Sequence, residues 1–168
     1  MLKPNFASII SALTVSIVLL VHAAAGVFLD SCQICFDNSG WRIQQLRGDH
    51  RSVFAARCND VKGGIWHQEL DLNNCLTNNM IGELFPKEKG DFTIGDVHTQ
   101  GCALCHVDVS YDKNATLLCV CGIRHDGSQA QGKFVRYNLD DVLSADDGIL
   151  GCFQGKYVGK LTDGCPED

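Results

Sequence analysis

The side chains of this sequence best suited to chemistry are its cysteines, which twice occur with the spacing Cys-x-x-Cys. The second motif runs into a histidine, as Cys102-Ala103-Leu104-Cys105-His106, and this matches the pattern for covalent attachment of c-type haem. The first motif, Cys32-Gln33-Ile34-Cys35, runs into Phe36, which cannot be an axial ligand. Haem attachment is therefore disfavoured, and we expect no cofactor.

Zinc binding and redox catalysis are the other chemistries that these cysteines could support. Four thiolates could hold zinc, those of Cys102, Cys105, Cys119 and Cys121. A Cys-x-x-Cys motif is typical of thioredoxin-like chemistry when a βαβ pattern surrounds it, and neither motif has one. Cys119 and Cys121 instead offer disulfide partners for the second motif, so we expect no metal site.

The histidines give no sign of catalysis. Beyond residue 25 they are His50, His67, His98, His106 and His125. None is grouped with a serine or a carboxylate in a recognisable catalytic motif. We expect them to be surface residues, and we do not expect an enzyme.

Residues 1–25 have the features of a signal peptide. Lys3 precedes an apolar run of 13 residues from Ile9 to Val21, and Ala23-Ala24-Ala25 supplies small residues for cleavage after Ala25. The run is shorter than the roughly 20 residues that span a bilayer, so a retained anchor is the less favoured alternative. We expect a secreted, extracellular protein with no membrane attachment after cleavage.

The composition of the exported part narrows the function classes further. The whole chain carries a net charge of −6, and loss of residues 1–25 removes only Lys3, which leaves −6 − 1 = −7. This charge disfavours nucleic acid and anionic lipid as partners. All ten cysteines lie beyond residue 25 and predict a disulfide framework in an oxidising compartment. Asn114-Ala115-Thr116 is a glycosylation sequon in a polar stretch.

The elements that position these residues come from an internal duplication. Residues 58–85 resemble residues 121–150, and each copy follows a Cys-x-x-Cys motif. A unit this short cannot bury a core alone, so the copies must fold against one another. We expect repeat one at about 28–85, a charged linker at 86–101, repeat two at about 102–153 and a polar tail at 154–168, with 26–153 as one domain.

Local patterns indicate strands joined by tight turns. Apolar residues alternate over 54–58 and 117–121, as in half-buried strands. Gly63-Gly64 and Asp147-Gly148 predict reversals. Asn73 and Asn74 in one copy, and Asn138, Asp140 and Asp141 in the other, suit the start of a single helical turn. The leucines expected to face inward beside these turns are Leu72, Leu76, Leu139 and Leu143.

The ordered features Cys58, Gly63-Gly64 and 70–73, repeated as Cys121 and 138–141, resemble the cyanovirin-N homology family. The Cys-x-x-Cys motifs and the further cysteines are similar to the secreted fungal branch of that family. The resemblance implies an all-β, pseudo-symmetric fold with exchanged hairpins, in which residues 28–70 pack with 139–153 and 71–85 with 102–138. It also implies a mannose-binding lectin with one glycan pocket at each end.

By the same resemblance, the first pocket is formed by Asp30, Ser31, Asn59, Val61, Ala145, Asp146 and Asp147. Ala145 stands where the family usually has Asn, and Val61 where a hydroxyl residue is common. Each sugar hydroxyl left without a partner costs about 1–3 kcal/mol. We therefore expect this pocket to be the weaker one.

The second pocket is formed, by resemblance, from Thr77, Asn78, Arg124 and Asp126. Its turn, Asn78-Asn79-Met80-Ile81-Gly82, is one residue longer than its counterpart in the other copy, and Met80 and Ile81 fall near where the family has an Asp. The alternative role for the polar residues of both pockets is to face solvent in a turn or to cap a helical turn. Trp41 and Trp66 could stack on sugar rings, although an aromatic side chain in a β protein is more often part of the core.

The resemblance further pairs Cys32 with Cys58 and Cys102 with Cys121. Proximity in the exchanged fold then places Cys75 near Cys105 and Cys119, and places Cys152 and Cys165 near Cys35. Two functions remain open. One is a secreted lectin-like protein that binds mannose-rich glycans, and the alternative is a secreted, effector-like module that contacts a surface protein after losing sugar binding.

Overall fold

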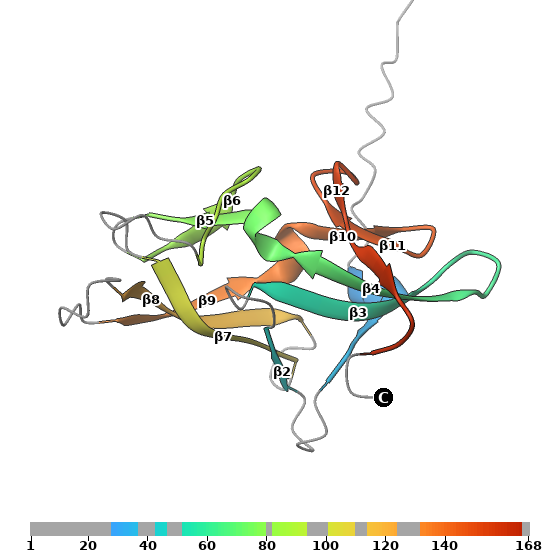
Figure 1. Ribbon diagram of the computed structural model, residues 1–168, viewed down its shortest axis with the longest axis horizontal. Coiled ribbons are helices and arrows are strands. Elements are labelled where there is room, and N and C mark those ends of the chain that lie inside the picture. The colour runs from blue at the N-terminus through green and yellow to red at the C-terminus, as the bar shows by residue number, and fades with distance from the viewer. Residues whose placement is uncertain are drawn as a thin grey trace, which may run out of the picture.

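The computed structural model describes residues 28–36, 43–46, 52–79, 82–93, 101–109, 114–123 and 132–165. These residues form an elongated all-β structure with short helical turns (Figure 1), which confirms the predicted fold class. The expected signal peptide at residues 1–25 lies outside the described residues, as do Trp41, Arg124 and Asp126. No helix in the described part of the chain is long and apolar enough to cross a bilayer.

The elements follow one another as α1 Phe28–Ser31, β1 Cys32–Ile34, β2 Ile43–Gln45, β3 Val53–Asn59, β4 Ile65–Asp71, η1 Leu72–Asn74, β5 Leu76–Asn78, β6 Leu84–Pro86, β7 Gly101–Asp108, β8 Thr116–Ile123, β9 Lys133–Asn138, η2 Leu139–Asp141, β10 Leu143–Asp146, β11 Ile149–Cys152, β12 Tyr157–Val158 and β13 Lys160–Thr162. The strands form sheets of order β1-β3-β4-β13, β2-β7-β8-β9, β10-β11-β12 and β5-β6.

The alternating patterns formed strands as predicted. In β3 the side chains of Phe54, Ala56 and Cys58 are buried, and in β8 those of Leu117, Cys119 and Cys121 are buried. One face of each strand therefore lies on the core, because successive side chains of a strand point to opposite faces. The other face of β8 is left for contacts outside the core.

A single 3₁₀ turn occurs in each repeat, as predicted. Asp71 caps η1 by accepting a hydrogen bond from the Asn73 amide at 3.0 Å, and Asn138 caps η2 by accepting one from the Asp140 amide at 3.1 Å. The first cap is thus Asp71 and not Asn73 or Asn74, because the cap must precede the first helical residue. The four leucines that flank these turns, Leu72, Leu76, Leu139 and Leu143, are buried as expected.

The repeats exchange hairpins in the expected sense. The buried side chain of Gln68 in β4 donates to the Gly148 carbonyl at 2.5 Å and accepts from the Leu150 amide at 3.1 Å. At the other end, Gly82 packs against Cys121 in β8. A Cβ atom added to Gly82 would lie 3.3 Å from the Cβ of Cys121. The two halves are also tied together by β2, which pairs with β7.

Five disulfides join all ten cysteines: Cys32–Cys58, Cys35–Cys165, Cys75–Cys152, Cys102–Cys121 and Cys105–Cys119. The first and fourth confirm the pairing implied by the resemblance, and the second confirms that Cys165 lies beside Cys35. The expected positions of Cys75 and Cys152 were wrong. These two cysteines bond to each other, because the exchange brings the residue after η1 to the end of β11.

The C-terminal segment 154–168 differs from the expected polar tail, because it carries β12 and β13. Strand β13 extends the first sheet along β4, with Lys160 opposite Glu69. The Gly159 amide donates to the Leu150 carbonyl at 2.8 Å, and Cys165 ties the segment to Cys35. These strands are two and three residues long, too short for an alternating pattern to reveal them.

Candidate binding sites

The first candidate site is end one, which we define as the β3–β4 turn at residues 60–64, the β10–β11 turn at 147–148, and α1. Figure 1 shows both turns at the same end of the molecule. The Val61 amide donates a hydrogen bond to Asp147 Oδ1 at 2.9 Å. Asp147 and Gly148 have φ angles of 45° and 79°, as a type I′ turn requires. The turn chemistry therefore places Asp147 against the neighbouring hairpin.

Asp60 holds the β3–β4 turn together from within. Its carboxylate accepts hydrogen bonds from the Lys62 amide at 2.8 Å, the Gly64 amide at 2.6 Å and Trp66 Nε1 at 3.0 Å. The Trp66 hydrogen bond, followed by that from Gly64, holds the pKa of Asp60 below its ordinary value of 3.8. Both oxygens of this carboxylate therefore serve the hairpin itself.

The structure assembles part of the predicted first pocket. Ser31 directly precedes Cys32, which pairs with Cys58, and Cys58 directly precedes Asn59. Asn59 is exposed, as are Asp146 and Asp147, whereas Ser31 is half-buried. Burial raises the pKa of Asp140 within η2, and the charges of Asp141 and Asp30 raise it further. Elements from both repeats therefore contribute to end one.

Four large apolar side chains in and beside the two turns of end one are exposed, which the sequence reasoning missed. Val61 is 84% exposed, Ile65 59%, Trp66 44% and Ile149 52%. Trp66 lies over Gly148, where an added Cβ would come within 2.7 Å of Trp66 Cδ1, so it does not belong to the core as an aromatic residue usually does. Its place two residues after Gly63-Gly64, at the tip of a hairpin, was the signal that could have revealed this.

The second candidate site is end two, which we define as the β5–β6 turn at residues 79–83 and the adjoining end of β8. Asn79 Nδ2 donates to Glu83 Oε2 at 2.9 Å, and the Glu83 amide donates back to Asn79 Oδ1 at 2.9 Å. Asn78 is half-buried on β5, and Thr77 is buried. Arg124 and Asp126 follow β8 but lie outside the described residues, as do Met80 and Ile81, so their part in this site stays a prediction.

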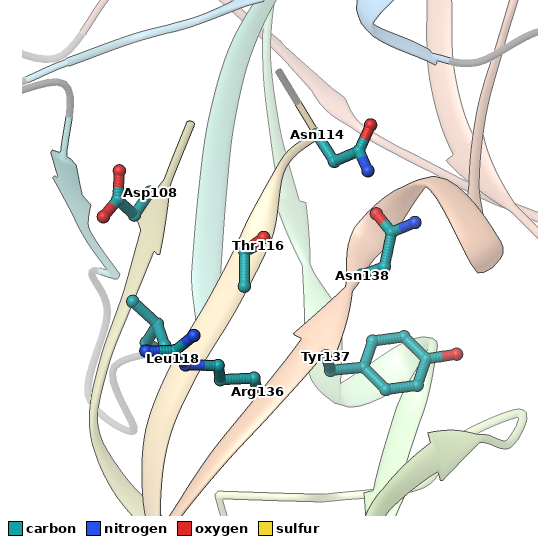
Figure 2. Close-up of a pocket in the computed structure, with 7 residues that line it drawn as sticks. All are labelled: Asp108, Asn114, Thr116, Leu118, Arg136, Tyr137 and Asn138. Carbon is teal, nitrogen blue, oxygen red and sulfur yellow. The ribbon is translucent and has the colours of Figure 1, made fainter. Parts of the chain in front are cut away.

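A hollow that no predicted pocket includes lies on the sheet of β7, β8 and β9 (Figure 2). Its volume is about 240 Å³. Asn114 and Thr116 of the glycosylation sequon line it, as do Leu118, Arg136 and Tyr137. The alternation over 117–121 predicted the outward face of β8, but the hollow itself depends on how side chains of neighbouring strands are arranged across the sheet.

One group of possible metal ligands occurs among the described residues. The ligand atoms of Cys35, His67 and Cys165 lie within 4.8 Å of one another. The two sulfurs are bonded to each other, so they offer no thiolates in this state.

The fold and its two hairpin ends define an all-β protein of the cyanovirin-N type. Residues 36–157 match the family model of the CVNH domain, and because this match spans most of the sequence, the protein belongs to the CVNH domain family. No curated protein matches the chain in sequence.

Solved structures show the same fold. A designed cyanovirin-N homolog lectin, LKAMG, is 16% identical, with 74% of this chain and 97% of that chain covered and a TM-score of 0.52. The CVNH protein of Gibberella zeae is also 16% identical, with 74% and 95% covered and a TM-score of 0.50. Microvirin, in complex with mannobiose, is 22% identical, with 66% and 94% covered and a TM-score of 0.45. At these identities the likeness to the first two structures establishes the fold alone.

Proposed function

We propose that this protein is a secreted, lectin-like protein that binds mannose-type glycans and catalyses no reaction. The observation that carries the proposal is the match of residues 36–157 to the CVNH domain, a fold shared with a protein designed as a lectin. Five disulfides are consistent with an oxidising, extracellular compartment. A surface glycoprotein that carries such glycans is the partner class that follows.

End two is the proposed principal sugar site. At end one the Asp60 carboxylate and one oxygen of Asp147 are already used by the two hairpins, and Ala145 and Val61 offer no side-chain hydrogen bonds. At end two, Asn78 has both a donor and an acceptor group, and Arg124 has forked donors that suit neighbouring hydroxyls. The sugar is therefore expected to bind mainly through Asn78 and Arg124, with Thr77 and Asp126 beside them.

Glycan-array binding of the secreted protein tests the proposal, followed by mannoside titration of two matched variants. Asn78→Ala should weaken binding by about 1–3 kcal/mol, the cost of an unpaired polar group. Asn59→Ala, the same change at end one, should alter it little. Equal losses in folded variants would contradict the ranking of the ends, and an array without any specific signal would contradict the lectin proposal.

A protein-interaction module is the second candidate, and the exposed apolar surface of end one favours it. Val61, Ile65, Trp66 and Ile149, on the two hairpins that meet at end one, are all more than two-fifths exposed, and exposed apolar side chains are a feature of interaction sites when they form one patch. Binding to cells whose mannose-type glycans have been enzymatically removed would test it. Under this second proposal binding persists, Val61→Ser with Ile149→Ser abolishes it, and Asn78→Ala leaves it unchanged.

A further inference from the structure

The hollow on the β7–β8–β9 sheet has the size and lining of a site for one sugar ring. Its volume of about 240 Å³ lies below the ~300–1,000 Å³ of typical ligand pockets. It faces away from the core, because Leu117 and Cys119 on the opposite face of β8 are buried. None of its lining residues belongs to either predicted glycan pocket.

Two residues of the sequon Asn114-Ala115-Thr116 line this hollow. Asn114 is exposed, whereas Ala115 between them is fully buried. The Ala115 carbonyl accepts a hydrogen bond from the Leu139 amide at 2.8 Å, and Thr116 pairs with Asn138 across the sheet. The backbone of the sequon is therefore held in place, with its acceptor side chain at the rim of the hollow (Figure 2).

We propose that Asn114 carries an N-linked glycan whose first sugar, N-acetylglucosamine, occupies this hollow. The Leu118 side chain supplies apolar surface for the C–H groups of the sugar. Tyr137 lies opposite Leu117 in the register of β8 and β9, so its ring packs toward the core and it lines the hollow from the strand itself. Arg136 supplies forked donors for its hydroxyl and acetamide oxygens. Asn138 uses Oδ1 to cap η2, so its contact with the sugar falls to its NH₂ group.

The modification is a transfer from a lipid-linked donor by the oligosaccharide transferase of the secretory pathway. Asn114 Nδ2 forms a bond to C1 of the first N-acetylglucosamine, the bond from C1 to the lipid diphosphate breaks, and the lipid diphosphate leaves with the electron pair. The amide proton passes to a basic group of the transferase. Because Ala115 is buried once β8 pairs with β9, the transfer precedes that pairing.

The test uses the full chain, with its own leader, expressed in a eukaryotic secretory host. Mass spectrometry of the peptide that contains Asn114 should show a glycan, which Thr116→Ala abolishes and Thr116→Ser retains. Endoglycosidase H then leaves one N-acetylglucosamine on Asn114. This trimmed protein should keep the melting temperature of the untrimmed protein, and it should melt about 2–4 °C above sugar-free Asn114→Asp.

A double-mutant cycle locates the first sugar. Arg136→Ala should lower the melting temperature of the trimmed protein more than that of Asn114→Asp. Lys133 is an exposed residue of the same strand that does not line the hollow. Lys133→Ala should therefore change the melting temperatures of the two proteins equally. If Asn114→Asp fails to fold, Thr116→Ala serves as the sugar-free reference.

Two results would overturn the proposal. The first is a secreted protein with unmodified Asn114. The second is a trimmed protein that has the same melting temperature as Asn114→Asp and for which Arg136→Ala has no larger effect than in Asn114→Asp.

Discussion

Asp147 accepts a hydrogen bond from the backbone amide of Val61 at 2.9 Å, across 86 residues of sequence. This contact joins the turns of two hairpins that belong to different repeats. The geometry has two requirements at residue 147, an acceptor oxygen in the side chain and a positive φ of 45°. Asn and Asp tolerate such a φ better than other residues with a side chain.

Substitutions at Asp147 should separate these two requirements. Asp147→Asn keeps the acceptor and the φ tolerance and should be nearly neutral. Asp147→Gly keeps only the φ tolerance and should lower the free energy of unfolding by about 0.5–1.5 kcal/mol, the usual worth of one hydrogen bond. Asp147→Ala should cost more than Gly. Denaturant unfolding measures all three, and a Gly variant as stable as the native protein would show that the hydrogen bond contributes nothing.

Gly148→Ala should be more harmful than Gly63→Ala. Both glycines have positive φ, 79° and 85°, so each Ala pays about 1–2 kcal/mol for a left-handed backbone. An added Cβ at Gly148 would also meet Trp66 Cδ1 at 2.7 Å and the Asp60 amide nitrogen at 3.0 Å, whereas at Gly63 it meets nothing within 4 Å. The difference in unfolding free energy measures this steric cost, and equal losses would contradict the packing of Trp66 on Gly148.

Acid should loosen the β3–β4 turn. The pKa of Asp60 in the fold is below 3.8, chiefly through the Trp66 hydrogen bond. Its stabilising contribution is therefore fully present above pH 3.8 and is lost as the pH falls through the folded pKa. An NMR titration of the Trp66 indole proton and the Asp60 carboxyl should show a midpoint below 3.8, which Trp66→Phe shifts upward. A midpoint unchanged by Trp66→Phe would contradict this assignment.

Asp140 should destabilise the protein at neutral pH. Both of its carboxyl oxygens are buried, and burial, aided by the charges of Asp141 and Asp30, raises its pKa above 3.8. Stability gained from the protonated form is present below pH 3.8 and is lost as the pH rises through the folded pKa. Asp140→Asn should raise the melting temperature at pH 7 and lose this gain near pH 3. The control is Asp141→Asn, at an exposed position, which should raise the melting temperature less. If Asp140→Asn lowered the melting temperature at pH 7, the predicted destabilisation by Asp140 would be wrong.

The Cys35–Cys165 disulfide should be the first to open under mild reduction. Cys165 is half-buried, whereas the nine other cysteines are buried, and attack on a disulfide depends on access to its sulfur. Graded reduction with a phosphine, followed by alkylation and peptide mapping, should label Cys35 and Cys165 before any other pair. Early labelling of Cys75 or Cys152 would contradict the order.

Features that depend on neighbouring residues could be predicted from the sequence. The duplication was recognisable as a likeness between two segments of the sequence. The alternation in β3 and β8, the reversal at Asp147-Gly148 and the inward leucines follow from side-chain periodicity and from local sterics. The pairings Cys32–Cys58 and Cys102–Cys121 were also predictable, because the resemblance to the family implied them, and the structure places each pair on adjacent antiparallel strands.

Features that depend on distant segments were decided only by the tertiary structure. The Cys75–Cys152 bond, the pairing of β13 with β4 and the exposure of Trp66 all result from how the exchanged hairpins dock. The hollow beside Asn114 likewise exists only because β7, β8 and β9 present their outer side chains together. The pattern of apolar residues in a strand indicates which of its faces is buried. Which segment covers that face depends on the free energy of the whole packed core, to which distant segments contribute.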